Sequence, residues 1–224
     1  MICIDLRGHG YSDKPLQIDF ADYASDIKEL LDYLYIRHAF FIGQELGATI
    51  AADFASKFDA YVDGLVLVNP ATLQAELPEA RLFRKYADTI RTWEDNKQQK
   101  FLDKHTYGSK KKAGKMLKNY SDMTPIMTGL EKRSVTASFE HTEIQPALNH
   151  IQAPVLIIQG KHDERLTSEE LAAYTDHIQH AQVETFERSG LYPMGEEKKR
   201  FLETVTAFIN VNEALEDEQQ RIKA

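Results

Sequence analysis

Residues 39–50 read AFFIGQELGATI, and they predict a strand that turns sharply into a helix. Ala39 to Ile42 is a short apolar run of the kind that forms a buried strand. Glycines then stand at positions 43 and 47, two residues before and two after Glu45. Such a sharp turn crowds the backbone at both places, so residues without bulk are expected there. The Glu45 side chain is then pushed outward at the carboxyl end of the sheet, where α/β proteins place their chemistry.

The segments on either side repeat this alternation of strand and helix. Apolar residues recur at helical spacing over 21–35, and residues 48–58 are small and apolar enough for a helix packed on a sheet. Short apolar runs predict further strands at 1–4 and 62–68. This spacing is typical of parallel strands joined by right-handed crossovers.

The pattern resumes in the last third of the chain. Residues 154–159 (PVLIIQ) predict a strand, and Thr167 with Glu170 three residues later predicts a capping box. The remaining expected elements are a helix over 168–178, a strand at 183–186, a helix over 193–209 and a polar tail that frays.

The segment between these two halves has a different composition. It is rich in Lys, Gln, Glu and Leu, and residues 81–118 hold twelve Lys or Arg against four acids, a local charge of +8 in a chain of net charge −8. Lysine-rich runs are usually solvated helical faces. We therefore expect four parts: a first core segment (1–73), a helical cap insertion (74–148), a second core segment (149–210) and the tail (211–224).

Composition excludes several classes of protein. The 224 residues are 42% hydrophobic, enough for a packed core, and the acidic net charge argues against binding to nucleic acid. A single cysteine, Cys3, excludes a disulfide framework and fits a reducing cytoplasm. The first apolar run is too short for a signal segment or a membrane span. The eight histidines show no metal-ligand spacing, so neither a metal nor a cofactor is expected.

Five blocks of sequence, taken together, point to one fold family. They are DLRGHGYS (5–12), IGQELGA (42–48), LVLVNP (65–70), PVLIIQGKHD (154–163) and SGLYPM (189–194). Their order and spacing resemble the α/β-hydrolase fold, in the capped group that includes esterases and haloalkane dehalogenases. The resemblance implies an α/β fold with a mostly parallel, doubly wound sheet, a helical cap and a catalytic triad.

The residues at the triad positions depart from that family. The resemblance places the nucleophile at Glu45, where the family normally has Ser and sometimes Asp or Cys. It places the triad acid at Asp163 and the general base at Leu191, where the family has His. Gln44 and Leu46, which flank the apex, are the candidates for the pocket and oxyanion positions.

A third departure concerns the sheet. By the same resemblance, the family's first three strands are absent, including one that would lie between the strands expected at 1–5 and 39–43. Unpaired central strands expose backbone groups. The two strands could close up, a partner segment could fill the gap, or the sequence could be a fragment of a longer product.

Three functions follow from these observations. The first is an α/β-hydrolase-fold protein that is catalytically impaired, because Leu191 cannot accept or donate a proton for Glu45. The second is an active small-molecule hydrolase, acting on an ester, lactone or similar substrate, with Glu45 as nucleophile or base. The third is an interaction module that completes its sheet with a partner chain. The partners expected are a small-molecule ligand, and a second copy or a strand donor, with no nucleic acid and no membrane.

Overall fold

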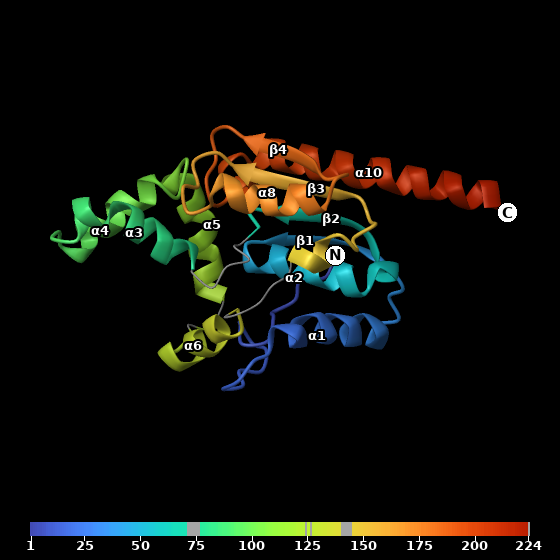
Figure 1. Cartoon of the computed structure of the whole chain (residues 1–224), viewed down its shortest axis with the longest axis horizontal. Helices are drawn as coiled ribbons and strands as arrows, with labels where there is room; N and C mark the ends of the chain where they lie inside the picture. The colour runs from blue at the N-terminus through green and yellow to red at the C-terminus, as the bar shows by residue number, and fades with distance from the viewer. Residues whose placement is uncertain (71–76, 124, 126, 140–144, 224) are drawn as a thin grey trace.

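A four-stranded parallel sheet forms the centre of the molecule (Figure 1). The computed structural model describes residues 1–70, 77–123, 125, 127–139 and 145–223. The strands follow the order β1-β2-β3-β4, and each pairs with the next in parallel. They are β1 (Ala39–Gln44), β2 (Val62–Val68), β3 (Val155–Gly160) and β4 (Gln182–Phe186). The structure thus confirms the four strands expected after residue 38 and the α/β class.

Helices cover both faces of this sheet, because successive strand residues point to opposite sides. Leu65, Leu67 and Ile157 belong to the core beneath α1 (Phe20–Tyr33), α2 (Leu46–Lys57) and α8 (Ser168–His177). Val66 and Ile158 face the other way, onto Phe201, Val205 and Phe208 of α10 (Lys198–Lys223). The predicted capping box at the start of α8 is present, with Thr167 and Glu170 bonded reciprocally.

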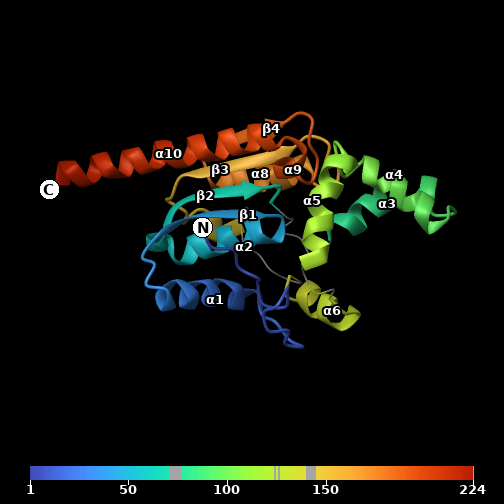
Figure 2. The same ribbon diagram turned by 180° about the vertical axis from the view of Figure 1, so that it is seen from behind.

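Five helices fill the segment between β2 and β3. They are α3 (Pro78–Ile90), α4 (Asp95–Lys104), α5 (Lys110–Met123), α6 (Gly129–Ala137) and α7 (Gln145–Leu148). Helices α3, α4 and α5 stand together at one end of the sheet, opposite the free end of α10 (Figure 2). Helix α7 packs against α2 and α8, and Leu148 lies in the same core as Leu65.

Two predicted features differ from the structure. The segment 1–4 was expected to be a strand, but the described residues 1–19 contain turns and no strand. A strand needs a paired neighbour. Here β1 is the edge of the sheet, and Ile2 and Ile4 are exposed by 53% and 43%. The completion of that edge by a second copy or a strand donor remains a prediction.

The C-terminal helix is the second difference. The helix expected over 193–209 is divided into α9 (Pro193–Glu196) and α10, and α10 continues through Lys223. The tail is therefore helical through Lys223, and whether it frays stays a prediction. Residues 211–223 are mostly Glu, Gln, Ala, Leu, Arg and Lys, which are strong helix formers. Val211 and Leu215 are more than half exposed.

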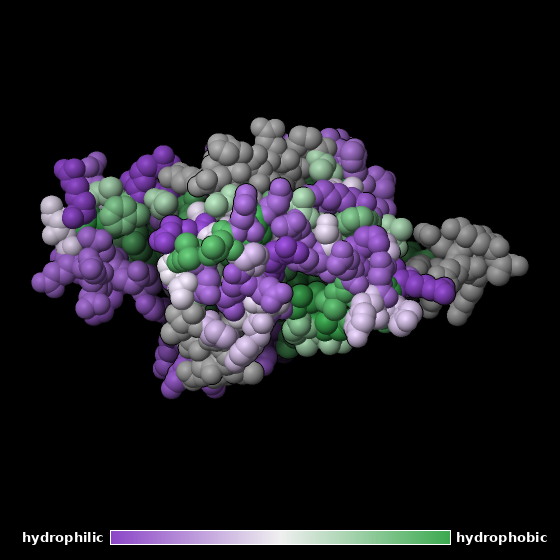
Figure 3. Space-filling model, turned by 90° about the horizontal axis from the view of Figure 1, so that it is seen from below, coloured by the Kyte–Doolittle hydropathy of each residue, from purple (hydrophilic) through white to green (hydrophobic). Residues whose placement is uncertain are grey.

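The face that carries α1 and α6 is mostly polar. Seen from that side, apolar side chains gather in a hollow near the middle of the molecule (Figure 3).

Candidate active site at the elbow after β1

Glu45 occupies the apex of the sharp turn that the sequence predicted. Its backbone has φ 47° and ψ −116°, a left-handed conformation that costs a non-glycine residue free energy. A side chain at Gly43 would place its Cβ 2.3 Å from the carbonyl oxygen of Gly47, so only glycine fits there. The expectation for Gly47 itself is wrong, since a Cβ at that position would meet no atom within 4 Å.

Arg165 holds the Glu45 carboxylate. The Arg165 Nη1 atom lies 2.8 Å from Glu45 Oε1, and the same nitrogen lies 2.6 Å from Oε1 of Glu79 on α3. The Nε and Nη2 atoms of Arg165 donate to the two oxygens of Asp163, at 2.8 and 2.7 Å. The structure therefore brings Glu45 and Asp163 together through a guanidinium. We call Glu45, Glu79, Asp163 and Arg165 the elbow cluster.

Burial sets the electrostatics of the elbow cluster. The side chains of Arg165 and Asp163 are 3% and 0% exposed, whereas that of Glu45 is 29% exposed. Burial raises the pKa of Glu45, and the nearby charges of Glu79 and Asp163 raise it further against the opposing effect of Arg165. Burial likewise raises the pKa of Asp163. Burial alone would lower the pKa of Arg165, but its carboxylate partners outweigh this and raise it. Three carboxylates thus share one cation.

Leu191 stands where the resemblance places the histidine. Its side chain is buried, with 5% of the residue exposed. Its N–H donates to the carbonyl of Thr106 at 2.8 Å, and its carbonyl accepts from the side-chain amides of Gln44 (2.7 Å) and Asn69 (3.0 Å). These hydrogen bonds fix the backbone of Leu191, but its side chain is a hydrocarbon that cannot transfer a proton. The Gln44 amide is engaged with Leu191, and Leu46 begins α2. Their assignment as oxyanion candidates remains a prediction.

Glu164 forms a second cluster beside the first. It accepts from His105 Nδ1 (2.7 Å), Tyr86 Oη (2.6 Å) and Lys85 Nζ (2.7 Å). Burial would raise the pKa of Glu164, but these three donors outweigh it and lower the pKa to about 2. We call Glu164, His105, Tyr86 and Lys85 the Glu164 cluster.

Three polar side chains of the five sequence blocks lie outside the elbow cluster: Ser189, His9 and His162. Ser189 is fully buried and donates to the Glu197 carboxylate at 2.8 Å. The Nδ1 atom of His9 lies 3.1 Å from the carbonyl oxygen of Arg7, and the His162 side chain is exposed. Sequence reasoning missed Arg165 and Glu79. The one available signal was an arginine two residues after the acid position, in the short sequence Asp163-Glu-Arg165.

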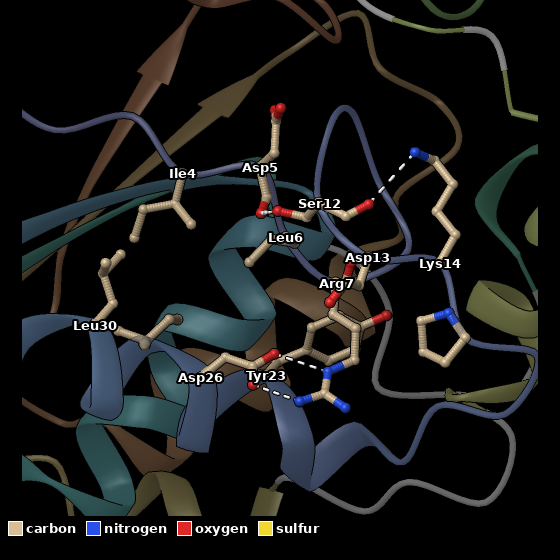
Figure 4. Close-up of a pocket in the computed structure, with 12 residues that line it drawn as sticks. Ile4, Asp5, Leu6, Arg7, Ser12, Asp13, Lys14, Tyr23, Asp26 and Leu30 are labelled. Atoms are coloured by element: carbon tan, nitrogen blue, oxygen red, sulfur yellow. Dashed lines mark hydrogen bonds and ion pairs between the residues drawn. The ribbon is translucent and has the colours of Figure 1, made fainter. Parts of the chain in front are cut away.

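A separate cavity of about 640 Å³ lies between the N-terminal segment and α1 (Figure 4). In its wall the Arg7 guanidinium pairs with Asp26 at 2.5 Å, and the Ser12 hydroxyl donates to the carbonyl of Asp5. Positive φ angles at Gly8 and Gly10 complete the turn. Residues 4–7, 12–15, 23, 26, 27 and 30 line the cavity.

The described ranges contain neither a candidate metal site nor a candidate membrane span. No three or more His, Cys, Asp or Glu side chains there are grouped so that they could hold a metal ion. No helix in the same ranges is both long and apolar enough to cross a membrane.

Known proteins match both the sequence and the fold. A family model described as the alpha/beta hydrolase fold matches residues 1–197. The 2-(acetamidomethylene)succinate hydrolase of Mesorhizobium japonicum is 28% identical over 76% of this chain, and the match spans 64% of that protein's length. The 3-oxoadipate enol-lactonase 2 of Acinetobacter baylyi is 26% identical over 84% of this chain and 71% of its own.

Solved structures show the same architecture. The enol-lactonase of Burkholderia xenovorans superposes with a TM-score of 0.72 at 20% identity, over 92% of this chain and 78% of that one. An esterase of Exiguobacterium antarcticum gives a TM-score of 0.73 at 20% identity, over 92% and 79% of the two chains. At these identities the structures show the shared fold alone. With the family match over residues 1–197, they establish that this chain belongs to the alpha/beta hydrolase fold family.

Proposed function

We propose that this chain is an α/β-hydrolase-fold protein that has lost hydrolysis by a Ser-His-Asp mechanism. The observation that carries the proposal is the 2.8 Å ion pair between Glu45, at the nucleophile position, and Arg165. A guanidinium remains protonated and cannot accept a proton from water or from a nucleophile. The hydrocarbon side chain of Leu191 cannot do so either.

The missing base matters most for turnover. An ester formed on Glu45 would have to be hydrolysed by an activated water molecule. Loss of a positioned general base typically costs about 10²–10⁴-fold in rate. In this proposal the fold is kept as a scaffold or as a pocket for a small molecule.

The test is a panel of short-chain p-nitrophenyl esters and simple lactones, assayed with the native chain and with Glu45→Ala. The matched control is Glu79→Ala, which removes another carboxylate from the same guanidinium but leaves the elbow unchanged. We expect all three proteins to hydrolyse every substrate at the rate of buffer. Turnover in the native chain and in Glu79→Ala that is lost in Glu45→Ala contradicts the proposal.

A second candidate function is hydrolysis of a small ester or lactone with Glu45 as nucleophile or base. Two observations favour it: the Glu45 side chain is 29% exposed, and its pKa is raised toward the range in which a carboxylate is an effective base. A relative named as a 3-oxoadipate enol-lactonase supports a lactone substrate, and one named as a 2-(acetamidomethylene)succinate hydrolase supports a hydrolytic reaction. Mass spectrometry after incubation with the ester panel distinguishes the nucleophile role, because a covalent intermediate adds the acyl mass to the peptide that contains Glu45.

A further inference from the structure

A cleft of about 510 Å³ lies between insertion helix α3 and the loop that follows β3. We propose that this cleft binds a small dianion through carboxylate or phosphate oxygens. The proposal does not depend on whether Glu45 reacts. The lining residues come from two separated parts of the chain: Arg81, Arg84, Lys85, Gln159, Lys161, Asp163, Glu164, Leu166, Thr167 and Ser168.

Cations outnumber acids in this lining. Arg81, Arg84 and Lys85 come from α3, and Lys161 follows β3 on the opposite side. The lining therefore holds four cations and two carboxylates, in a chain whose net charge is −8. A concave surface lined mainly by one sign of charge concentrates ions of the opposite sign.

The two carboxylates of the lining are already engaged. Asp163 is fully buried and accepts both of its bonds in the Arg165 fork. Glu164 is held by three donors in the Glu164 cluster, so its charge is largely compensated. Both lining carboxylates therefore already have donors, and Glu164 keeps those of His105 and Tyr86 when Lys85 turns to a ligand.

The ion pairs that the cations make differ in how easily a ligand could replace them. Lys161 pairs with Glu187 and both side chains are exposed, by 58% and 60%. Lys85 is 54% exposed in its pair with Glu164. Exposed pairs of this kind contribute little to stability, so an anion can take over their cations at low cost. Arg81 instead pairs at 2.5 Å with the buried carboxylate of Glu170, which fixes its guanidinium at the cleft.

The start of α8 supplies further polar groups. Thr167 and Ser168 line the cleft at the start of α8. The Thr167 hydroxyl already accepts from the Glu170 N–H, and Glu169 and Glu170 lie in the first turn of that helix, so the cations of the lining carry the proposal. Three cations therefore face the cleft from α3, and Lys161 and two hydroxyl groups face it from the core. A ligand with two negative charges offers acceptors to the cations of both walls.

Isothermal titration calorimetry of the full chain tests this proposal with two probes, succinate and inorganic phosphate, at constant ionic strength. Neutral succinamide is the control ligand. We expect saturable binding of at least one dianion, with a dissociation constant of about 0.1–1 mM, and no binding of succinamide. Binding of succinate alone assigns the cleft to dicarboxylates, and binding of phosphate alone assigns it to phosphate groups.

Exposed lysine and arginine substitutions show whether the bound dianion occupies this cleft. Arg84→Ser on α3 and Lys161→Ser on the core side should each weaken binding by about fivefold or more, because each removes a charged donor. Lys199→Ser makes the same change of charge at a side chain of α10 that is 91% exposed, and should leave binding unchanged. Absence of binding by both dianions, or equal weakening by Lys199→Ser, overturns the proposal.

Discussion

Glu164 and Arg165 are adjacent in the chain, yet they lie at the centres of two ion clusters with opposite balances of charge. In the Glu164 cluster one carboxylate receives three donors, and its pKa falls to about 2. In the elbow cluster one guanidinium serves three carboxylates, and the pKa of Glu45 and of Asp163 rises. Exposure differs as well, since the Glu164 side chain is 35% exposed and that of Asp163 is fully buried.

The contrast shows that the presence of an ion pair does not by itself determine how much the pair contributes to stability. Where donors outnumber a partly exposed carboxylate, the charged form is favoured and water screens the pair. In the elbow cluster three carboxylates share one cation, and Asp163 among them is fully buried whereas Glu79 is 65% exposed. Removal of Arg165 therefore leaves the buried charge of Asp163 without a partner. Variants of the two clusters and of the elbow that carries Glu45 should therefore differ in stability.

Removal of the shared cation should have the largest effect. Arg165→Met leaves Asp163 and Glu45 without their partner, and should lower the free energy of unfolding by about 3–5 kcal/mol in urea denaturation. Arg91→Met is the control, because Arg91 is 69% exposed and lies 3.9 Å from its partner Asp88. It should change stability by less than about 0.5 kcal/mol. Similar losses in the two variants contradict the contrast between the clusters.

The loss in Arg165→Met should also depend on pH. A carboxyl group whose pKa is raised in the folded state stabilises the fold below its unfolded pKa, and this stability is lost as pH rises through the folded pKa. Without Arg165 the pKa of both carboxyls rises further. The deficit of the variant should therefore be smallest near pH 4.5, the ordinary value for Glu, and should grow toward neutral pH. A deficit that does not change over this range contradicts the explanation.

Substitution of the elbow glycine Gly43 should have the next largest effect on stability. Gly43→Ala places a Cβ 2.3 Å from the Gly47 carbonyl and should cost about 1–3 kcal/mol, as overpacking generally does. Gly47→Ala is the matched variant, because a Cβ there meets open space. Since α2 begins at Leu46, alanine at 47 should stabilise the helix by about 0.5–1 kcal/mol. Thermal unfolding measures both, and equal effects of the two substitutions contradict the geometry.

The Glu164 cluster should be less sensitive. Glu164→Gln should cost less than about 1 kcal/mol at neutral pH, because its ion pairs are exposed. The sign of the pH dependence is opposite to that of the elbow cluster. The lowered pKa of Glu164 gives stability that is present above pH 4.5 and is lost as pH falls toward about 2. Glu164→Gln should lack this part of the dependence of stability on acid pH. A loss of unfolding free energy as large as that of Arg165→Met contradicts the difference between the two clusters.

Glu45→Gln should have the smallest effect at neutral pH. Ionised Glu45 is disfavoured in the folded state, so a neutral amide should leave stability unchanged or raise it by on the order of 1 kcal/mol. The decline of stability above pH 4.5 should become shallower. A loss of several kcal/mol in urea denaturation at neutral pH would mean that Glu45 is needed to balance Arg165.

Much of the fold could be predicted from sequence because it depends on local pattern. Three apolar runs became β1 to β3, and the mixed segment 183–186 became part of β4. Glycine, proline and polar residues bound these segments, and Gly43 predicted the elbow. The segment 1–4 has the same apolar character, but a strand depends on a neighbour that local sequence does not supply. The tail was judged by its polarity, although its residues favour a helix.

The sequence predicted which positions make up the candidate site, but not the ion pairs that connect them. The glycine pair pointed to Glu45, and the family resemblance pointed to Asp163 and Leu191. The elbow cluster, however, depends on one guanidinium reaching residues 86 and 120 positions away in sequence. That approach is set by the packing of α3 and of the loop after β3. No periodicity or spacing in the chain encodes it.

The central claim is that Glu45 is paired with Arg165 and that Leu191, at the position of the family's histidine, cannot shuttle a proton for it. The most direct measurement is the rate of p-nitrophenyl acetate hydrolysis by the native chain, divided by the rate of Glu45→Ala under identical conditions. The account predicts a ratio of about one, because no positioned base takes part in either protein. A ratio above about 10², with Glu79→Ala retaining the native rate, would show that Glu45 is a working nucleophile or base and would contradict the account.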